Sequence, residues 1–498
     1  MSDTLRTALA AVLPATRLDL VDLARIASIS SDAAHAADVR LVIDRVAELA
    51  TDAGAAAVEV VAAGGHPAVI ATWPAPPGSP TVLLYAHADV QPTGPIEHWT
   101  SPPFEPTERD GRLYGRGAAD DKAGVAMHLA VLRAFGGTPP VGVVLFVEGE
   151  EEIGSPTLVA LLAEHRDVLR SDVIVIADSA NAGVDIPAFT TSLRGLVDAY
   201  VEVQTHQSPL HSGVYGGPAA DALTALCRLL ATLHTDDGTV AVEGLHVGTS
   251  TAADVPEEQF RAAVGMVAGM QLLGCGTVPD RLWNKPAISV LGLDAPSTAE
   301  ASNVLLPRAR AKVSLRLAPG DEAGSALKAL TAHLERHVPW GAAVNVVPGS
   351  AGEPFALSTT GDVYDLARAA FAEAYGNEAV EMGQGGSIPF IAEFARANPG
   401  ATVLVTGVGD PSSNWHGIDE SLHLAMWESA CLAELLLLES LAPQHLSPPT
   451  DRLAPEEGGR TDHVEPDERR PLEPGALRVE DDDHRDEHRD DQDRDQQR

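Results

Sequence analysis

Hydrophobic positions along the first 190 residues follow two alternating periods. Segments with a helical period, such as 38–54 ("DVRLVIDRVAELATDAG"), are separated by the short apolar runs "TVLLYAHADV", "VGVVLFVEG" and "SDVIVIADS". Strands alternating with helices of this length are typical of an open α/β sheet with helices on both faces. Ligands of such sheets bind beyond the carboxyl ends of the strands. Each of the three runs ends in acidic residues or histidine.

The pattern changes between residues 192 and 353. Helical segments 220–234 and 324–338 are accompanied by strand-like segments 195–205 and 310–319, which predicts a smaller inserted α+β domain. The α/β pattern then resumes with "DLARAAFAEAYG", "ATVLVTGVG" and an amphipathic helix near residues 421–441. We therefore expect a catalytic domain in two parts, residues 1–191 and 354–442. The insertion between them spans residues 192–353, and a tail covers residues 443–498.

The tail alternates Asp with Arg and His and has almost no aromatic or β-branched residues, so we expect it to be disordered. Its His-Asp pattern could bind metal loosely, but a solubilising acidic tail is the favoured interpretation. The net charge of −37 argues against a nucleic-acid partner.

No apolar run approaches the length of a membrane span, and the N-terminus lacks the pattern of a signal peptide, so we expect a cytoplasmic protein without a membrane partner. Cys227, Cys275 and Cys431 are far apart in the sequence, and we expect buried thiols rather than disulfides or metal ligands.

Potential metal ligands gather at the predicted strand ends. In 81–90 the side chains of His87 and Asp89 leave the same face of a strand, where a carboxylate can orient an imidazole. Further candidates are Asp120 and Asp121 before a helix, Glu150 to Glu152 after the second run, Asp178 and His416. Taken singly, His87 could be an ordinary strand-end histidine and one of the paired aspartates a helix cap. Together, nitrogen and oxygen ligands without cysteine suit zinc, or else cobalt or manganese, in a two-metal hydrolase.

The ordered motifs resemble the M20 family of metallopeptidases, in particular its dipeptidase and carnosinase branch. The matching text is "HADVQP", Trp99, Pro103 and Phe104, "DGRLYGRGAADDKAG", "EGEEEIGSP", "ADS", "SLRG", "LHSGVYGG", "NVLLP", "SLRLAPG", "GGSIP" and "HGIDE". These motifs cover roughly residues 10 to 440. The resemblance implies a three-layer α/β/α catalytic domain with an inserted ferredoxin-like domain that acts as lid and dimerisation domain, and hence a homodimer.

The resemblance also implies a role for each candidate ligand. His87 and Asp178 would bind one divalent ion, Glu152 and His416 a second, and Asp120 would bridge both. Asp89 would hold His87, and the peptide bond that follows Asp120 would be cis. Glu151 would be the general base that takes a proton from the water between the metals. Glu150 is left without a role, so the sequence predicts that Glu150→Gln is nearly silent and that Glu151→Gln abolishes turnover while sparing metal binding.

For the substrate, the resemblance implies that Arg316 holds a free carboxylate and that His211 reaches the partner subunit's active site. Asn303 and Ser387 match further substrate contacts. The chain departs from the family at Pro209, at the "HGIDE" motif and at Gln384, where many dipeptidases have Glu, so its specificity could differ.

We expect a dipeptidase acting on small peptides with a free carboxylate, and Asp178 in place of Glu favours this branch. An N-acyl-amino-acid or N-carbamoyl amidohydrolase is the alternative on the same site, and an inactive peptide-binding relative is a remote one.

Overall fold

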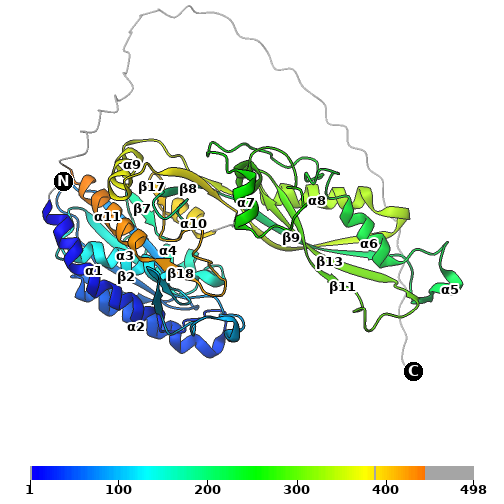
Figure 1. Cartoon of the computed structure of the whole chain (residues 1–498), viewed down its shortest axis with the longest axis horizontal. Coiled ribbons are helices and arrows are strands. Elements are labelled where there is room, and N and C mark those ends of the chain that lie inside the picture. The colour runs from blue at the N-terminus through cyan, green and yellow to red at the C-terminus, as the bar shows by residue number, and fades with distance from the viewer. Residues whose placement is uncertain (1–2, 386–388, 444–498) are drawn as a thin grey trace, which may run out of the picture. The chain divides into compact units, whose positions relative to one another are not determined.

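A computed structural model describes residues 3–385 and 389–443 of the chain (Figure 1). Its largest sheet has six strands in the order β1-β2-β6-β3-β7-β17. The strands are β1 (Ala57–Val61), β2 (Ala68–Trp73), β3 (Thr81–His87), β6 (Gly142–Glu148), β7 (Val173–Ile176) and β17 (Thr402–Val405). β6, β3, β7 and β17 run parallel, whereas β2 is antiparallel to both of its neighbours. β1 runs in the same direction as these four strands, so the carboxyl ends of five strands meet at one edge.

Both faces of this sheet are covered. The side chains of Leu84 and Ala86 join a core with α1 (Asp3–Ala24), α2 (Ala36–Asp52), α3 (Lys122–Ala134), α9 (Asp362–Tyr375) and α11 (Leu424–Ser440). The alternate side chains of Leu83 and Tyr85 join a second core with α4 (Leu158–Glu164) and α10 (Pro389–Ala397). Alternating strand residues thus bury apolar area on both faces, which explains the unbroken apolar runs in the sequence. The predicted three-layer α/β/α architecture is confirmed.

A second sheet, β11-β13-β9-β14, is antiparallel throughout. In chain order its elements are β9 (Gly195–Gln204), α6 (Ala222–Ala231), β11 (Ala287–Asp294), β13 (Arg308–Leu317), α8 (Ala323–His337) and β14 (Ala343–Gly352). This βαββαβ order, with the first and third strands adjacent at the centre, is the ferredoxin-like arrangement. Its two helices and four strands share a hydrophobic core of their own. α7 (Glu257–Ala263) lies in the long connection before β11.

Three small sheets complete the described chain. β8 (Ala188–Leu193) pairs with β15 (Phe355–Ala356) and β16 (Val380–Gln384), so it joins segments from before and after the insertion. β18 (Ser421–His423) pairs with β5 (Arg112–Tyr114), which pairs with β4 (Thr107–Arg109). β10 (Leu210–His211) pairs with β12 (Val304–Leu305), and α5 (Ser212–Tyr215) follows it. The α/β fold therefore resumes after residue 353, as the sequence pattern indicated.

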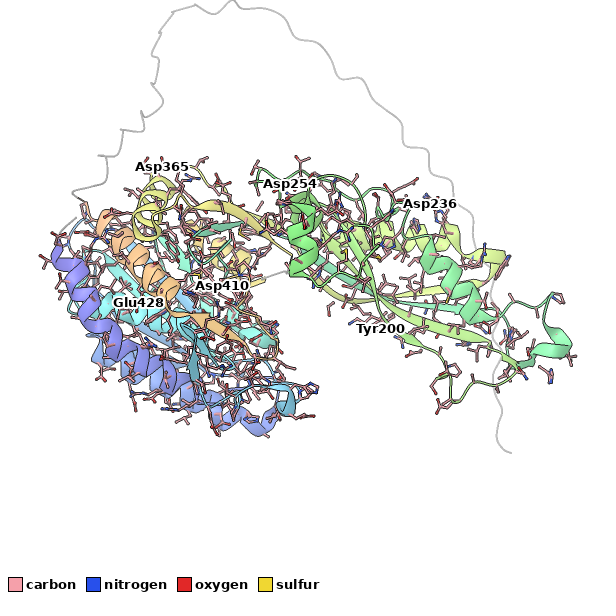
Figure 2. All side chains as sticks on the ribbon, viewed as in Figure 1. Tyr200, Asp236, Asp254, Asp365, Asp410 and Glu428 are labelled. Atoms are coloured by element: carbon pink, nitrogen blue, oxygen red, sulfur yellow. The ribbon has the colours of Figure 1, made fainter. Side chains whose placement is uncertain are left out.

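Acidic side chains are spread over the described surface. Asp236, Asp254, Asp365 and Glu428, labelled in Figure 2, are all exposed and come from different parts of the chain. Cys431 is buried, but Cys227 and Cys275 are exposed, so the expectation of three buried thiols was wrong for two of them. α11 is buried on nearly all sides rather than on one stripe. Within the described residues, no helix is long and apolar enough to cross a membrane. The predicted tail lies outside the described residues.

Candidate metal centre

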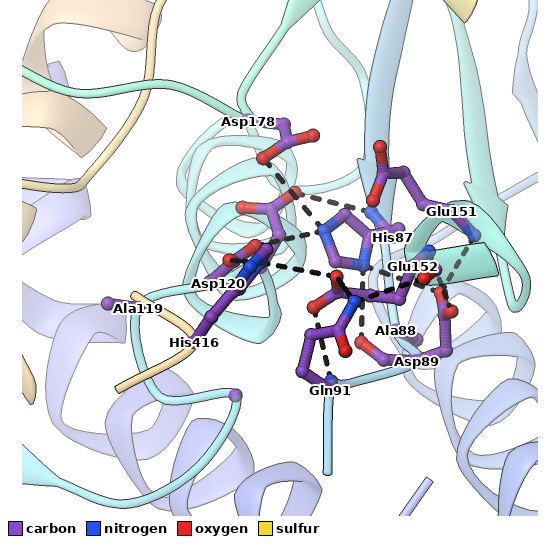
Figure 3. A network of polar contacts seen from close by, with 12 residues as sticks. His87, Ala88, Asp89, Gln91, Ala119, Asp120, Glu151, Glu152, Asp178 and His416 are labelled. Carbon is purple, nitrogen blue, oxygen red and sulfur yellow. Dashed lines mark hydrogen bonds and ion pairs between the residues drawn. The ribbon is translucent and has the colours of Figure 1, made fainter. Parts of the chain in front are cut away.

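Six potential ligands converge beyond the carboxyl edge of the six-stranded sheet (Figure 3). β3 ends at His87, and β6 leads into the short helix η3 (Glu151–Ile153), which carries Glu151 and Glu152. Asp178 follows β7, and His416 lies in the loop after β17. Asp120 comes from the turn before α3. Parallel strands thus bring together residues that are up to about 330 positions apart, as expected for an open α/β sheet.

Asp120 lies between the two histidines. One of its oxygens, Oδ1, is 3.1 Å from His87 Nε2, and the other, Oδ2, is 3.1 Å from His416 Nε2. His87 Nε2 is 3.9 Å from Asp178 Oδ1, and His416 Nε2 is 3.2 Å from Glu152 Oε2. Each imidazole thus has a carboxylate of its own and shares Asp120 with the other, which is the arrangement expected of a bridging ligand.

The potential ligand atoms form two groups, within each of which all atoms lie within 4.8 Å of one another. The first group consists of His87, Glu151 and Asp178, and the second of Asp120, Glu152 and His416. Glu151, predicted as the general base, therefore lies beside the first pair of ligands. Its position is compatible with proton transfer at that group and also with direct coordination.

The site concentrates negative charge. In the described part of the chain, no Lys or Arg forms an ion pair with Asp120, Glu151, Glu152 or Asp178. Burial raises the pKa of Asp178 to about 7 and that of Glu151 well above its ordinary value. Burial also opposes ionisation of Asp120, but hydrogen bonds from His416 and His87 outweigh it and lower the pKa of Asp120. Buried carboxylates need a positive partner, and imidazole nitrogens with carboxylate oxygens suit divalent zinc. The residues fit divalent cations.

Asp89 positions both halves of the site. Its carboxylate oxygen Oδ1 lies 3.4 Å from His87 Nδ1, the contact expected from the sequence. The same carboxylate accepts hydrogen bonds from the backbone N–H groups of Glu151, at 3.1 Å, and Glu152, at 3.0 Å. Asp89 is fully buried. It therefore fixes the imidazole and the η3 backbone at once, and only the first of these roles was visible in the sequence.

Gln91 is a site residue that sequence reasoning missed. Its side-chain amide donates to Glu152 Oε2 at 2.8 Å and to the Glu152 carbonyl oxygen at 3.0 Å. Its backbone N–H donates to Glu152 Oε1 at 3.2 Å. Gln91 thus orients the Glu152 carboxylate. The available signal was its place in "HADVQP", two residues after Asp89 on the same strand end.

Glu150 has a structural role, which corrects the interpretation that it has none. It is buried, and its carboxylate accepts hydrogen bonds from the backbone N–H of His66, at 3.0 Å, and of Thr157, at 2.8 Å. The Thr157 hydroxyl donates to the same carboxylate. Glu150 therefore ties the loop between β1 and β2 to the loop before α4. Silence of Glu150→Gln is no longer expected.

Asp121 also departs from the simplest interpretation of the sequence. It occupies the N-cap position of α3 without a side-chain capping bond, and instead accepts a hydrogen bond at 3.2 Å from the His87 backbone N–H. The peptide bond between Asp120 and Asp121 is cis, as the resemblance implied.

The predicted substrate residues lie on other elements. His211 is exposed on β10, and its ring nitrogen Nδ1 accepts a hydrogen bond from Gly213. Asn303 is also exposed. It lies beside His211, because the backbone N–H of Ser212 donates to the Asn303 carbonyl oxygen at 3.0 Å. Arg316 lies near the end of β13. Among the hydrogen bonds and ion pairs of the described residues, none joins the side chain of His211, Asn303 or Arg316 to these ligand groups. Ser387 lies outside the described residues.

The fold and the donor set define a two-domain α/β metallohydrolase. The chain belongs to peptidase family M20/M25/M40, whose model matches residues 83–440. It is an M20-type metallopeptidase, as the sequence motifs predicted.

Two relatives with curated names and one solved structure illustrate the similarity. The cysteinylglycine-S-conjugate dipeptidase of Corynebacterium striatum is 37% identical over 366 residues, which span 72% of this chain and 80% of that protein. The human Beta-Ala-His dipeptidase is 28% identical over 376 residues, spanning 72% of this chain and 74% of that protein. The crystal structure of human carnosine dipeptidase 1 superposes with a TM-score of 0.73 at 25% identity, covering 88% of this chain and 99% of that chain. These relatives favour the dipeptidase prediction over the amidohydrolase alternative.

Proposed function

We propose that the protein is a two-metal dipeptidase that hydrolyses the peptide bond of dipeptides, or of similar small substrates with a free carboxylate. The observation that carries this proposal is the Asp120 carboxylate, whose two oxygens each lie 3.1 Å from a different histidine. In this assignment His87 and Asp178 would hold one ion, Glu152 and His416 would hold the other, and Asp120 would be a ligand of both. The names of the relatives support the dipeptide as substrate.

When bound, two divalent ions would supply Lewis acidity that activates water and polarises the scissile carbonyl. Glu151 would accept the proton from the attacking water and deliver it to the leaving amine. Its place in the group with His87 and Asp178 supports this assignment, because a general base must lie within reach of the water that it deprotonates. Asp89 would hold His87 in one tautomer and keep Glu151 in place through its backbone N–H.

Arg316 would bind the free carboxylate of the substrate. Arg316 lies close to Arg194 in the fold. It pairs with Leu196, two residues after Arg194, at the start of β9, and with Ala287 at the start of β11. Arg194 Nε is buried without a hydrogen-bond partner in the described structure, and burial and the Arg316 charge lower the pKa of Arg194 to about 10. No carboxylate among the described residues pairs with either guanidinium. An anionic substrate group would supply the missing charge.

The assignment of His211 and Asn303 requires a second subunit. Both residues are exposed next to each other at β10 and β12, and His211 belongs to neither ligand group of its own chain. We propose a homodimer through the ferredoxin-like domain, in which His211 reaches the partner's site. The exposed apolar side chains of Val290, Leu291 and Leu293 on the edge strand β11 support this, since an unpaired apolar edge is a natural pairing surface.

Zinc is the proposed ion, with manganese or cobalt able to use the same ligands. We propose a cytoplasmic location, and the net charge of −37 supports the absence of a nucleic-acid partner.

A substrate panel tests the proposed function. The purified protein would be assayed with zinc, manganese or cobalt against S-substituted Cys-Gly, β-Ala-His, other dipeptides, N-acetyl amino acids and N-carbamoyl amino acids. We expect hydrolysis of dipeptides and a strong loss of rate when the substrate's carboxylate is amidated. Hydrolysis of only the acyl or carbamoyl substrates would contradict the proposal.

A further inference from the structure

A fully buried carboxylate, Glu420, underlies the turn that carries Asp120. It accepts backbone hydrogen bonds from Gly117 at 3.1 Å, Ala119 at 3.0 Å and Asp120 itself at 3.2 Å. It also accepts a hydrogen bond at 2.6 Å from Nη1 of Arg116, which is buried as well. Four donors thus converge on one carboxylate, and three of them belong to the backbone that sets the position of Asp120.

The other guanidinium nitrogen of Arg116 reaches two further site segments. Nη2 donates to the carbonyl oxygen of Gly417 at 3.1 Å and to that of Pro92 at 3.2 Å. Gly417 directly follows His416, and Pro92 directly follows Gln91, which holds Glu152. The ion pair of Arg116 and Glu420 therefore contacts the backbone of Asp120 and the immediate neighbours of His416 and Gln91. These are the segments that supply or orient the second ligand group.

Burial of an ion pair is weak evidence for a stabilising role, because the loss of hydration offsets most of the attraction. His128 and Glu434 form a second buried ion pair with which Arg116 and Glu420 can be compared. His128 Nδ1 lies 2.8 Å from Glu434 Oε2. That pair joins α3 to α11, and its third contact is the carbonyl oxygen of Tyr85. It touches none of the proposed ligands. Arg116 and Glu420 differ in that each described hydrogen bond of their side chains beyond the pair goes to a segment that carries or adjoins a site residue.

We propose that Arg116 and Glu420 are positioning residues for the metal centre. They fix the Asp120 turn and the His416 loop relative to each other, so that Asp120, Glu152 and His416 are arranged for a cation before it binds. This inference rests on the proposed two-metal site. It concerns the ligand geometry of this chain and does not depend on the identity of the substrate.

The test compares Glu420→Gln with Glu434→Gln. The second variant is the control, because it disrupts the equally buried pair of His128 and Glu434, which touches no proposed ligand. Zinc binding to the metal-stripped proteins would be titrated against a competing chelator, and the rise in melting temperature with zinc measured in parallel. Glu420→Gln is expected to weaken binding of the zinc ion that Asp120, Glu152 and His416 would hold by about 10- to 100-fold, the range typical for residues that support metal ligands. Its zinc-induced stabilisation should shrink accordingly. Glu434→Gln should lower the melting temperature of the metal-free protein but keep wild-type zinc affinity.

A folded Glu420→Gln protein that binds two zinc ions with wild-type affinity would overturn the inference while leaving the proposed function intact. A wild-type protein that binds no divalent ion would overturn both. If Glu420→Gln does not fold, Arg116→Lys serves instead, because lysine keeps the charge but cannot span Glu420, Pro92 and Gly417 together. Weakened zinc binding in that folded variant supports the inference, and unchanged binding overturns it.

Discussion

Glu150, Glu151 and Glu152 follow β6 directly, and each carboxylate faces different neighbours. Glu150 points to the backbone of His66 and Thr157, whereas Glu152 points to Gln91 and His416. Glu151 belongs to the group with His87 and Asp178. Three adjacent residues at a strand end can point in different directions, so one charged segment supplies a structural tie, a potential ligand and a candidate base.

At the residue scale we predict that Glu150→Gln destabilises the fold. The carboxylate accepts hydrogen bonds only, whereas a glutamine amide would turn a donor toward the N–H groups of His66 or Thr157. Leaving a fully buried group unpaired costs about 1–3 kcal/mol, and these part-buried groups should cost toward the lower end of that range. Denaturant unfolding of the metal-free protein would show the loss, while kcat of the folded enzyme should stay near the wild-type value. Unfolding identical to the wild type would refute the structural role.

The grouping of the candidate ligands was predictable from the sequence because they follow apolar runs or precede a helix, and parallel strands end at one edge, whereas the role of each came from the family resemblance. The supporting residues were not. Glu420 bonds to Gly117, which is 303 positions away, and Glu150 bonds to His66 across 84 positions. No local period or spacing encodes such contacts. The fold class was predictable from alternating helical and strand periods, whereas the exposure of Cys227 depends on tertiary packing.

Among the elements, the packing of α3 on α11 includes a titratable pair. Burial lowers the pKa of His128, but the charge and hydrogen bond of Glu434, with a further bond to the Tyr85 carbonyl, outweigh it and raise that pKa. A group whose pKa is raised in the folded state stabilises that state fully below its unfolded pKa of about 6.5. This contribution is lost as the pH rises through the folded pKa.

We therefore predict that the metal-free protein loses part of its unfolding free energy as the pH is raised from about 6 through the folded pKa of His128. Glu434→Gln removes the partner charge, so the variant should lose less unfolding free energy over this range. The loss that remains comes from other groups with raised pKa values, His87 and His416 among them. Parallel denaturant titrations over the pH range would measure the difference. The same pH slope in both proteins would show that the pair does not titrate as described.

At the scale of the whole molecule, the proposed dimer makes each active site depend on two chains. His211→Ala and Glu151→Gln should each inactivate the homodimer, because one removes the residue donated by the partner and the other the base. Mixing and reassociating the two variants should restore activity at about a quarter of the sites, since half of the dimers are mixed and each contains one intact site. Activity assays before and after reassociation would detect this. No recovery in verified mixed dimers would contradict His211 acting in the partner's site.

The domain division belongs to the same scale. The ferredoxin-like core draws on residues between Val197 and Val346, inside the proposed domain of residues 192–353. β8 and β16 link the flanking segments. We expect limited proteolysis of the native protein to cut first in exposed connections and to leave the cores of both domains intact.

The central claim is that a metal centre with Glu151 as proton carrier performs the hydrolysis. Its most direct test is the Glu151→Gln protein, with metal content and dipeptide turnover measured on the same sample. The account predicts two divalent ions per chain, as in the wild type, with turnover reduced by about 100- to 10,000-fold, the usual contribution of a general base. Turnover within a few-fold of the wild type, or loss of a metal ion from the variant, would contradict it.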